Sequence, residues 1–190
     1  NETGINNTLF IHLTLVPYMK ASDEIKTKPT QHSVKELRSL GIGPNLLICR
    51  SEQELPKDEK EKIALFCSVH KNNVISMHDV ETVYSIPILL NKQKADQIIL
   101  KKLNINSKNP NLLDWKGVVR AKLQPKGETN IAFVGKYTEL KDSYKSSNEA
   151  LDHAGIKNKI KVNINFVEAE TITRRNVKTI LKDCDGVLVP

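Results

Sequence analysis

The stretch Leu9-Phe10-Ile11-His12-Leu13-Thr14-Leu15-Val16, residues 9–16, decides the fold class of this chain. It is an apolar run with β-branched members that ends at Pro17, a pattern typical of a strand in a buried core. Two further apolar runs, 45–49 and 74–77, are expected to be strands as well, and a helical pattern separates each strand from the next. Strands and helices that alternate through short connections predict an α/β fold with a parallel sheet covered by helices.

Two helices are predicted between these strands. Ser33 and Glu36 have the spacing of a capping box, which marks the start of the first helix, and Gly41 is expected to stop it. The charged run 57–61 is expected to open the second helix. The side chains expected to face the core are Val34, Leu37 and Leu40 in the first helix and Ile63, Leu65 and Phe66 in the second.

The second half of the chain repeats this alternation after a break. Helices are predicted at 95–103, 112–123, 143–154 and 174–181, and strands at 131–134, 162–167 and 186–189. The segment 124–129 contains Pro and Gly and has the composition of a linker. The predicted organisation is a domain at 1–123, a linker at 124–129 and a second, three-stranded parallel domain at 130–190.

The length of 190 residues exceeds one typical domain of about 100–150 residues and falls short of two. Because the chain stops in the apolar run 186–190, which looks like a strand ending at a turn, we expect a segment of a longer protein. No apolar run approaches the roughly 20 residues of a membrane span, and no secretory signal opens the sequence. The three cysteines form no C-x-x-C pair, which favours small buried thiols in a reducing compartment.

The charge balance is basic, with 29 Lys and Arg against 22 Asp and Glu, a net charge of +7. Such an excess favours a partner that carries phosphates, either a nucleotide or a nucleic acid. Aromatic residues make up only 5% of the chain, so there is little material on which bases could stack. An α/β module that binds nucleotides or nucleic acid without catalysis is therefore the alternative to an enzyme.

The loop after the first strand carries the most informative polar groups. Lys26-Thr27-Lys28-Pro29-Thr30-Gln31, residues 26–31, offers two ammonium groups, two hydroxyls and an amide ahead of a helix N-terminus. These groups can hold a triphosphate and read the edge of a base. A solvated turn is the alternative, but the position between a core strand and a helix favours a binding site.

Open α/β sheets bind ligands at the carboxyl ends of their strands, so the other strand ends matter too. Arg50 follows the second strand and can bind phosphate, or it can form a surface salt bridge. His78-Asp79-Val80 follows the third strand, where the histidine suits acid–base work or packing. Lys62 lies on the second predicted helix, where its long side chain can extend past the apolar face to bind an anion. The alternative is that it only places its charge in solvent. Gly135-Lys136-Tyr137 is a weak signal, and no Walker A loop, metal cluster or nucleophile elbow occurs.

Taken in order, these segments resemble the bacterial type of cytidine triphosphate (CTP) synthase. The resemblance runs along the whole chain, and its most specific part is the Lys-Thr-Lys-Pro-Thr-Gln block; the segments that carry it are 10–18, 26–37, 48–51, 62–67 and 134–137. It implies the C-terminal part of a P-loop-like synthetase domain followed by the start of a class I glutamine amidotransferase domain. In that family ATP and Mg²⁺ serve to phosphorylate the 4-oxygen of UTP, and ammonia from glutamine displaces the phosphate to give CTP.

The resemblance implies three sets of contact residues. UTP, or CTP as feedback inhibitor, would contact Lys26, Thr27, Lys28, Pro29, Thr30, Gln31 and Lys62. ATP would contact Arg50, His78, Asp79 and Val80, which makes the histidine a contact residue instead of a catalyst. The allosteric activator GTP would contact Lys136, Tyr137, Asp142 and Lys145. The full-length enzyme is implied to be a cytoplasmic homotetramer that binds UTP, ATP, glutamine and CTP, and neither nucleic acid nor a membrane.

No catalytic residue is expected within the chain. In the family, the phosphate-binding loop and the Mg²⁺ carboxylates precede the position of Asn1, and the nucleophilic Cys with its His and Glu follows Pro190. Cys184 is therefore not expected to be the nucleophile, and the chain alone is expected to be inactive. Another P-loop amidotransferase of the same architecture would lack the 26–31 block.

Overall fold

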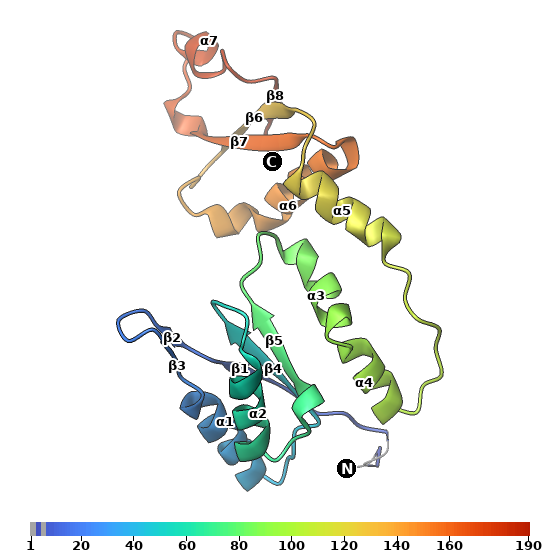
Figure 1. Ribbon diagram of the computed structural model, residues 1–190. Coiled ribbons are helices and arrows are strands. Elements are labelled where there is room, and N and C mark those ends of the chain that lie inside the picture. The colour runs from blue at the N-terminus through green and yellow to red at the C-terminus, as the bar shows by residue number, and fades with distance from the viewer. Residues whose placement is uncertain (1–2, 5–6) are drawn as a thin grey trace. The chain divides into compact units, whose positions relative to one another are not determined.

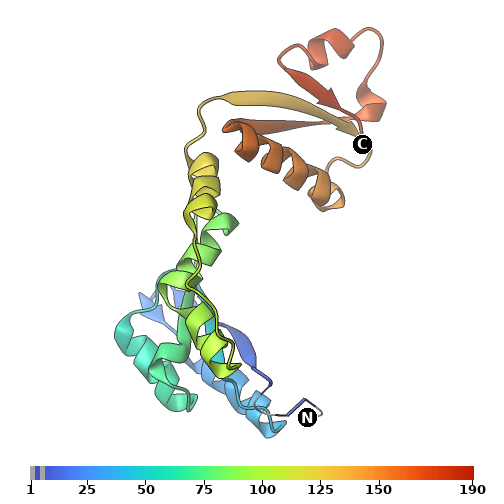
Figure 2. The same cartoon turned by 90° about the vertical axis from the view of Figure 1, so that its right-hand side faces the viewer.

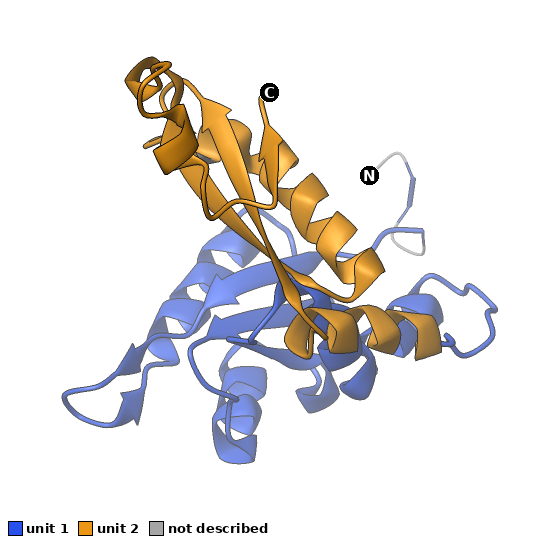
Figure 3. Cartoon of the chain, turned by 90° about the horizontal axis from the view of Figure 1, so that it is seen from above, with its two compact units in different colours: residues 1–111 blue, residues 112–190 orange. Residues whose placement is uncertain are grey.

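The computed structural model describes residues 3–4 and 7–190, which divide into two compact units. Unit 1 extends to Asn111 and unit 2 comprises Leu112–Pro190 (Figure 3). The predicted domain boundaries at 123 and 130 stay a prediction. The helix at 112–123 packs against a later helix of unit 2, and residues 128 and 129 of the expected linker already belong to a strand. Among the described residues no helix is long and apolar enough to cross a membrane.

Unit 1 is built on a parallel three-stranded sheet in the order β1-β4-β5, as the apolar runs predicted (Figure 1). The strands are β1 (Ile11–Leu15), β4 (Leu46–Ser51) and β5 (Val74–His78). A short antiparallel hairpin of β2 (Tyr18–Met19) and β3 (Glu24–Ile25) follows β1 and was not predicted. Two residues per strand are too few to show a period in the sequence.

Helices cover both faces of this sheet. They are α1 (Lys28–Ser39), α2 (Lys57–Phe66), α3 (Ile86–Lys92) and α4 (Ala95–Lys102), with 3₁₀ turns η1 (Lys71–Asn73) and η2 (Val83–Ser85). Leu47 and Cys49 on one face of β4 share a buried cluster with α1 and α2, whereas Leu46 on the other face packs with Ile75 and Ala95. Because side chains alternate along a strand, one apolar run supplies both cores.

The predicted capping box is wrong. Helix α1 begins at Lys28, five residues earlier, with Pro29 in its first turn, where a residue without an N–H costs no hydrogen bond. Ser33 therefore lies inside the helix, and its hydroxyl bonds to Nε2 of His12 at 2.8 Å. As a consequence, residues 28–31 belong to the first turn of α1 and not to a loop ahead of it.

The expected core faces are only partly correct. Val34 and Ile63 are buried, but Leu40, Leu65 and Phe66 are exposed by 77%, 76% and 63%. In α2 the buried residues are Ile63 and Ala64, and Cys67 just beyond the helix is buried as well. A helix turns by 3.6 residues, so Cys67 follows Ile63 on the same face while Leu65 points away from it.

Unit 2 is a second parallel sheet in the order β7-β6-β8, and its three strands confirm the expected ones. Its elements are α5 (Leu113–Leu123), β6 (Glu128–Gly135), η3 (Lys141–Tyr144), α6 (Lys145–Asn158), β7 (Lys161–Glu168), η4 (Ala169–Thr171), α7 (Val177–Ile180) and β8 (Gly186–Leu188). The long helix α6 runs along the sheet and packs against β7 (Figure 2). Phe133 of the central strand is fully buried, and its ring meets that of Tyr144 at 4.8 Å.

Candidate functional site

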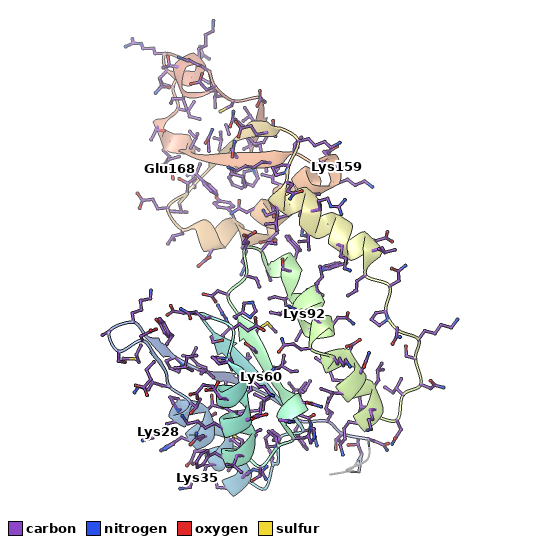
Figure 4. All side chains as sticks on the ribbon, viewed as in Figure 1. Lys28, Lys35, Lys60, Lys92, Lys159 and Glu168 are labelled. Carbon is purple, nitrogen blue, oxygen red and sulfur yellow. The ribbon has the colours of Figure 1, made fainter. Side chains whose placement is uncertain are left out.

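A pocket of about 280 Å³ in unit 1 gathers most of the residues that the sequence assigned to UTP. Its lining is Glu24, Ile25, Lys26, Thr27, Lys28, Gln31, Lys62 and Phe66. The hairpin supplies one wall, the first turn of α1 a second and the C-terminal half of α2 the third. Lys28 is labelled at the start of α1 in Figure 4. Five of the seven predicted side chains therefore face one cavity.

The other two predicted residues have structural roles. Thr30 is fully buried, and its hydroxyl lies 3.1 Å from that of Thr14 and 3.2 Å from the carbonyl oxygen of Leu15. These hydrogen bonds hold the first turn of α1 against β1. Pro29 supports the same turn through its fixed φ. Both residues thus position the pocket without lining it.

The pocket is cationic, and its acidic residues only partly offset that charge. Lys26 Nζ lies 2.5 Å from Oε2 of Glu24, and Lys62 Nζ lies 3.4 Å from Oε2 of Glu59. The hydrogen bond and the charge of Lys26 hold the pKa of the Glu24 carboxyl below its usual value. Lys28 forms no ion pair with any residue that the structure describes.

The start of α1 adds to this positive potential. The helix has 12 residues, no acidic residue in its first turn and no side-chain cap on its backbone N–H groups. A helix N-terminus of this kind attracts anions through its dipole and its free N–H groups. Gln31 donates from Nε2 to Oγ1 of Thr27 at 3.2 Å, which holds its amide at the pocket wall.

Sequence reasoning missed three lining residues. Glu24 and Ile25 lie on the hairpin strand that carried no periodic signal. Phe66 was assigned to the core, but it is largely exposed and borders the pocket. Its spacing of four residues from Lys62 places both on one face of α2, and this signal could have been used.

A second cluster forms where β4 and β5 end. Ser51 and His78 are register partners, so the residues around them meet at the carboxyl edge of the sheet. Arg50 forms an ion pair with Asp79 and donates from its guanidinium to the carbonyl oxygen of Ser51 at 2.9 Å. Nδ1 of His78 is buried and has no hydrogen-bond partner among the described residues. With Val80 following, the predicted ATP residues are brought together.

The four residues that the resemblance assigned to GTP lie on the connection from β6 to α6. Tyr137 is 75% exposed and has a left-handed φ of 56°. Lys136 forms an ion pair with Glu170 at 3.1 Å. Asp142 and Lys145 are exposed on η3 and at the start of α6. In the part of the chain that the structure describes, these four side chains make no hydrogen bond or ion pair with one another.

The fold and the two clusters of unit 1 define a class: a parallel-sheet α/β protein with cationic sites suited to ligands that carry phosphates. Comparison with known proteins narrows the class. A family model described as CTP synthase N-terminus matches residues 1–105. A CTP synthase from Pelagibacter ubique (strain HTCC1062) is 53% identical over 191 residues, which cover 100% of this chain and 36% of that relative.

The chain belongs to the CTP synthase family. This confirms the resemblance, and it gives no support to a basic binding module outside the family. The chain spans 36% of the length of the curated relative. The match to the N-terminal family model covers the strands and helices that build both clusters of unit 1.

Proposed function

We propose that the full-length enzyme converts UTP to CTP and that unit 1 contributes contacts to UTP and ATP. One observation carries this proposal: Lys26, Lys28 and Lys62 line a single pocket together with Thr27 and Gln31. Three ammonium groups match the charge of a triphosphate, and a Gln amide can pair with a ring carbonyl and a ring N–H at once. The same pocket would accept CTP, because the triphosphate is common to substrate and product.

The reaction that follows from the family is an ATP-dependent amination. The γ-phosphoryl group passes from ATP to the uracil 4-oxygen and leaves ADP. Ammonia, released as glutamine is hydrolysed to glutamate, attacks C4, and the 4-oxygen departs with the phosphate. In this scheme the two clusters of unit 1 bind and orient the nucleotides, because their acidic residues Glu24 and Asp79 are paired with cations.

The second cluster supports a role at ATP. Arg50 can move its guanidinium from Asp79 to a phosphate oxygen, since the pair is about half exposed. Nδ1 of His78 is buried and has no hydrogen-bond partner in the described part of the chain, which suits a contact to a base edge. Asp79 and Val80 continue the chain from His78, so we propose the segment 78–80 for the adenine ring of ATP and Arg50 for its phosphates.

Further features of the proposal concern the rest of the enzyme. We propose that residues 130–190 begin a class I glutamine amidotransferase domain, that GTP contacts Lys136, Tyr137, Asp142 and Lys145, and that the enzyme is a cytoplasmic homotetramer. The reaction also needs Mg²⁺. Within residues 3–4 and 7–190, no three His, Cys, Asp or Glu side chains gather where they could hold a metal ion. These residues do not fit a Mg²⁺ site, and no step of the scheme is routed through the ion.

The test is Lys26→Ala in the full-length enzyme. A hydrogen bond to a charged group contributes about 1.5–3 kcal/mol, so we expect UTP and CTP to bind at least about tenfold more weakly. Glutamine hydrolysis is expected to change much less. Binding is measured by calorimetry and hydrolysis by ammonia release.

Lys35→Ala is the matched control, because Lys35 is an exposed lysine on α1, the helix that begins at the pocket, and does not line the pocket (Figure 4). It is expected to leave both affinities unchanged. An unaltered UTP affinity in Lys26→Ala, or an equal loss in both variants, would count against the assignment.

A further inference from the structure

A larger groove in unit 1 lies apart from both clusters described above. It has a volume of about 700 Å³ and is bordered by the N-terminal half of α2, by η1 and by the junction of α3 with α4. None of the residues assigned to UTP or ATP lines it. The lining polar residues are Glu54, Lys57, Lys60, Glu61, Lys71, Asn72, Lys92, Gln93, Lys94, Gln97 and Lys101. A volume of this size falls in the range of small-molecule sites, about 300–1,000 Å³.

The lining has a strong excess of positive charge, with six lysines against two glutamates. Lys71 is paired with Glu61 at 3.5 Å. The other five lysines form no ion pair with any residue in the described part of the chain. Like charges that converge on a concave surface repel one another and raise the local concentration of anions.

One of the positive charges of the groove, that of Lys60, lies on a half-buried side chain, which is labelled on α2 in Figure 4. Its Nζ donates to Oε1 of Gln93 at 3.3 Å. Burial lowers the pKa of this ammonium. Gln93 is held in place because it also bonds the backbone N–H and carbonyl of Ser76 on β5, at 2.9 and 2.8 Å. The ammonium of Lys60 therefore rests on a fixed amide, and the nearby Glu54 of the groove lining partly offsets its charge.

We propose that this groove binds a small ligand with several consecutive phosphates. The geometry favours a phosphate chain because Lys57 and Lys60 on α2 face Lys92 and Lys101 across it, so point charges approach from two sides. No aromatic side chain is among the lining residues, so the groove offers no stacking surface for bases. The lack of a stacking surface argues against single-stranded nucleic acid as the ligand. The groove would therefore recognise the phosphates of its ligand and not a base.

The test is residue-resolved lysine acetylation of the full-length enzyme, read by mass spectrometry, with saturating CTP present to fill the smaller pocket. Inorganic tripolyphosphate is the probe. We expect it to slow acetylation of Lys57, Lys92 and Lys101 several-fold and to leave the exposed Lys35 and Lys157 unchanged. A parallel series with ATP tells whether the phosphate chain belongs to a nucleotide or to a bare polyphosphate. If ATP protects these lysines at a lower concentration than tripolyphosphate does, the ligand is a nucleotide. If ATP protects them equally or less well, the ligand is a bare polyphosphate.

A variant supplies the second arm. Lys57→Gln/Lys92→Gln/Lys101→Gln removes three exposed charges and none of the buried contacts, and we expect at least a tenfold weaker tripolyphosphate affinity by calorimetry with CTP affinity retained. Lys35→Gln/Lys108→Gln/Lys157→Gln is the charge-matched control, expected to change the affinity less than twofold. Equal losses in both triple variants, uniform protection of all lysines, or tighter protection by an oligonucleotide would overturn the proposal. If the wild-type enzyme bound tripolyphosphate in the groove but did not bind CTP, that result would contradict the proposed function and leave the groove proposal standing.

Discussion

The two units use the same parallel α/β plan but bury very different amounts of apolar surface. Among the described residues, thirteen buried apolar side chains lie in unit 1 and three in unit 2. The three are Ala132, Phe133 and Val134, and all belong to the central strand β6. In unit 1 buried side chains come from strands and helices on both faces of the sheet. Stability that rests on apolar burial is therefore concentrated in unit 1.

The exposed apolar side chains also differ between the two units. In unit 1 Leu13 and Leu15 are exposed on a single face of β1, by 65% and 62%. In unit 2 exposure extends to the strand β8, where Val187 is 52% exposed. Among the described residues, the buried apolar clusters of unit 1 join strands and helices, whereas the buried apolar side chains of unit 2 all lie on β6. The following variants test this difference.

The largest effect is expected from Leu47→Ala in unit 1. Leu47 is fully buried between β4 and the helices α1 and α2, so truncation leaves a cavity and costs about 2–5 kcal/mol. Hydrogen exchange should rise across residues 11–78 and stay unchanged in unit 2. Leu65→Ala, at a 76% exposed position, is the control and should change the free energy of unfolding by less than about 0.5 kcal/mol. Equal effects of the two variants would show that unit 1 has no well-packed core.

The next effect depends on pH and also belongs to unit 1. Burial raises the pKa of the Cys49 thiol from 9.0 to about 11. The folded state then keeps a proton that the unfolded state loses, so stability is full below pH 9 and falls by about 2–3 kcal/mol as the pH rises to 11.

Cys49→Ala should remove most of this slope, which urea unfolding at several pH values measures. A part will remain, because burial also raises the pKa of Cys67 in the same cluster. Cys184→Ala, at a half-buried thiol of unit 2, should keep the wild-type slope. An unchanged slope in Cys49→Ala would contradict the assignment.

Because apolar runs bounded by turns are local signals, the sequence predicted the strands of both parallel sheets, but not the hairpin of β2 and β3. The start of α1 could not be placed in this way, since Ser33 and Glu36 offer a competing capping box. What decides the start is tertiary: the hydroxyl of Ser33 bonds His12 on β1, and Thr30 is fastened to the same strand. Helix α3 was not predicted as a helix of its own, since the helix expected in this region began at residue 95, where α4 begins. The left-handed Lys94 that separates α3 from α4 is not a residue type that marks a break.

The sequence predicted the lysines of the candidate site, but it did not predict all of the other residues that line the pocket. Lys26, Lys28 and Lys62 were assigned from their positions and from family resemblance, and the pocket brings them together. Glu24 could not be assigned, because a two-residue strand carries no periodic signal. Phe66 was assigned to the core, although its spacing of four residues from Lys62 already places both residues on one face of α2. The larger groove was missed for a different reason: its lysines are spread over 57–101, and only the fold shows that they converge.

The smallest expected effects compare two glycines within unit 2, where the core is thin. Gly155 lies in α6, and a Cβ there would stand 2.8 Å from the carbonyl oxygen of Ile160 and 2.9 Å from Cγ2 of Val162. Gly155→Ala should therefore destabilise unit 2 by about 1–3 kcal/mol, since backbone must shift to make room. Gly117 lies in α5 with nothing within 4 Å of a Cβ, so Gly117→Ala should stabilise its helix by up to about 1 kcal/mol.

Hydrogen exchange of unit 2 separates these outcomes, because both changes add one methyl group to a helix and differ only in what that group meets. Protection of α6 and β7 should fall in Gly155→Ala, and protection of α5 should rise in Gly117→Ala. Unit 1 should not respond to either change. If Gly155→Ala were as mild as Gly117→Ala, the close approach of α6 to the start of β7 would not require a glycine at position 155.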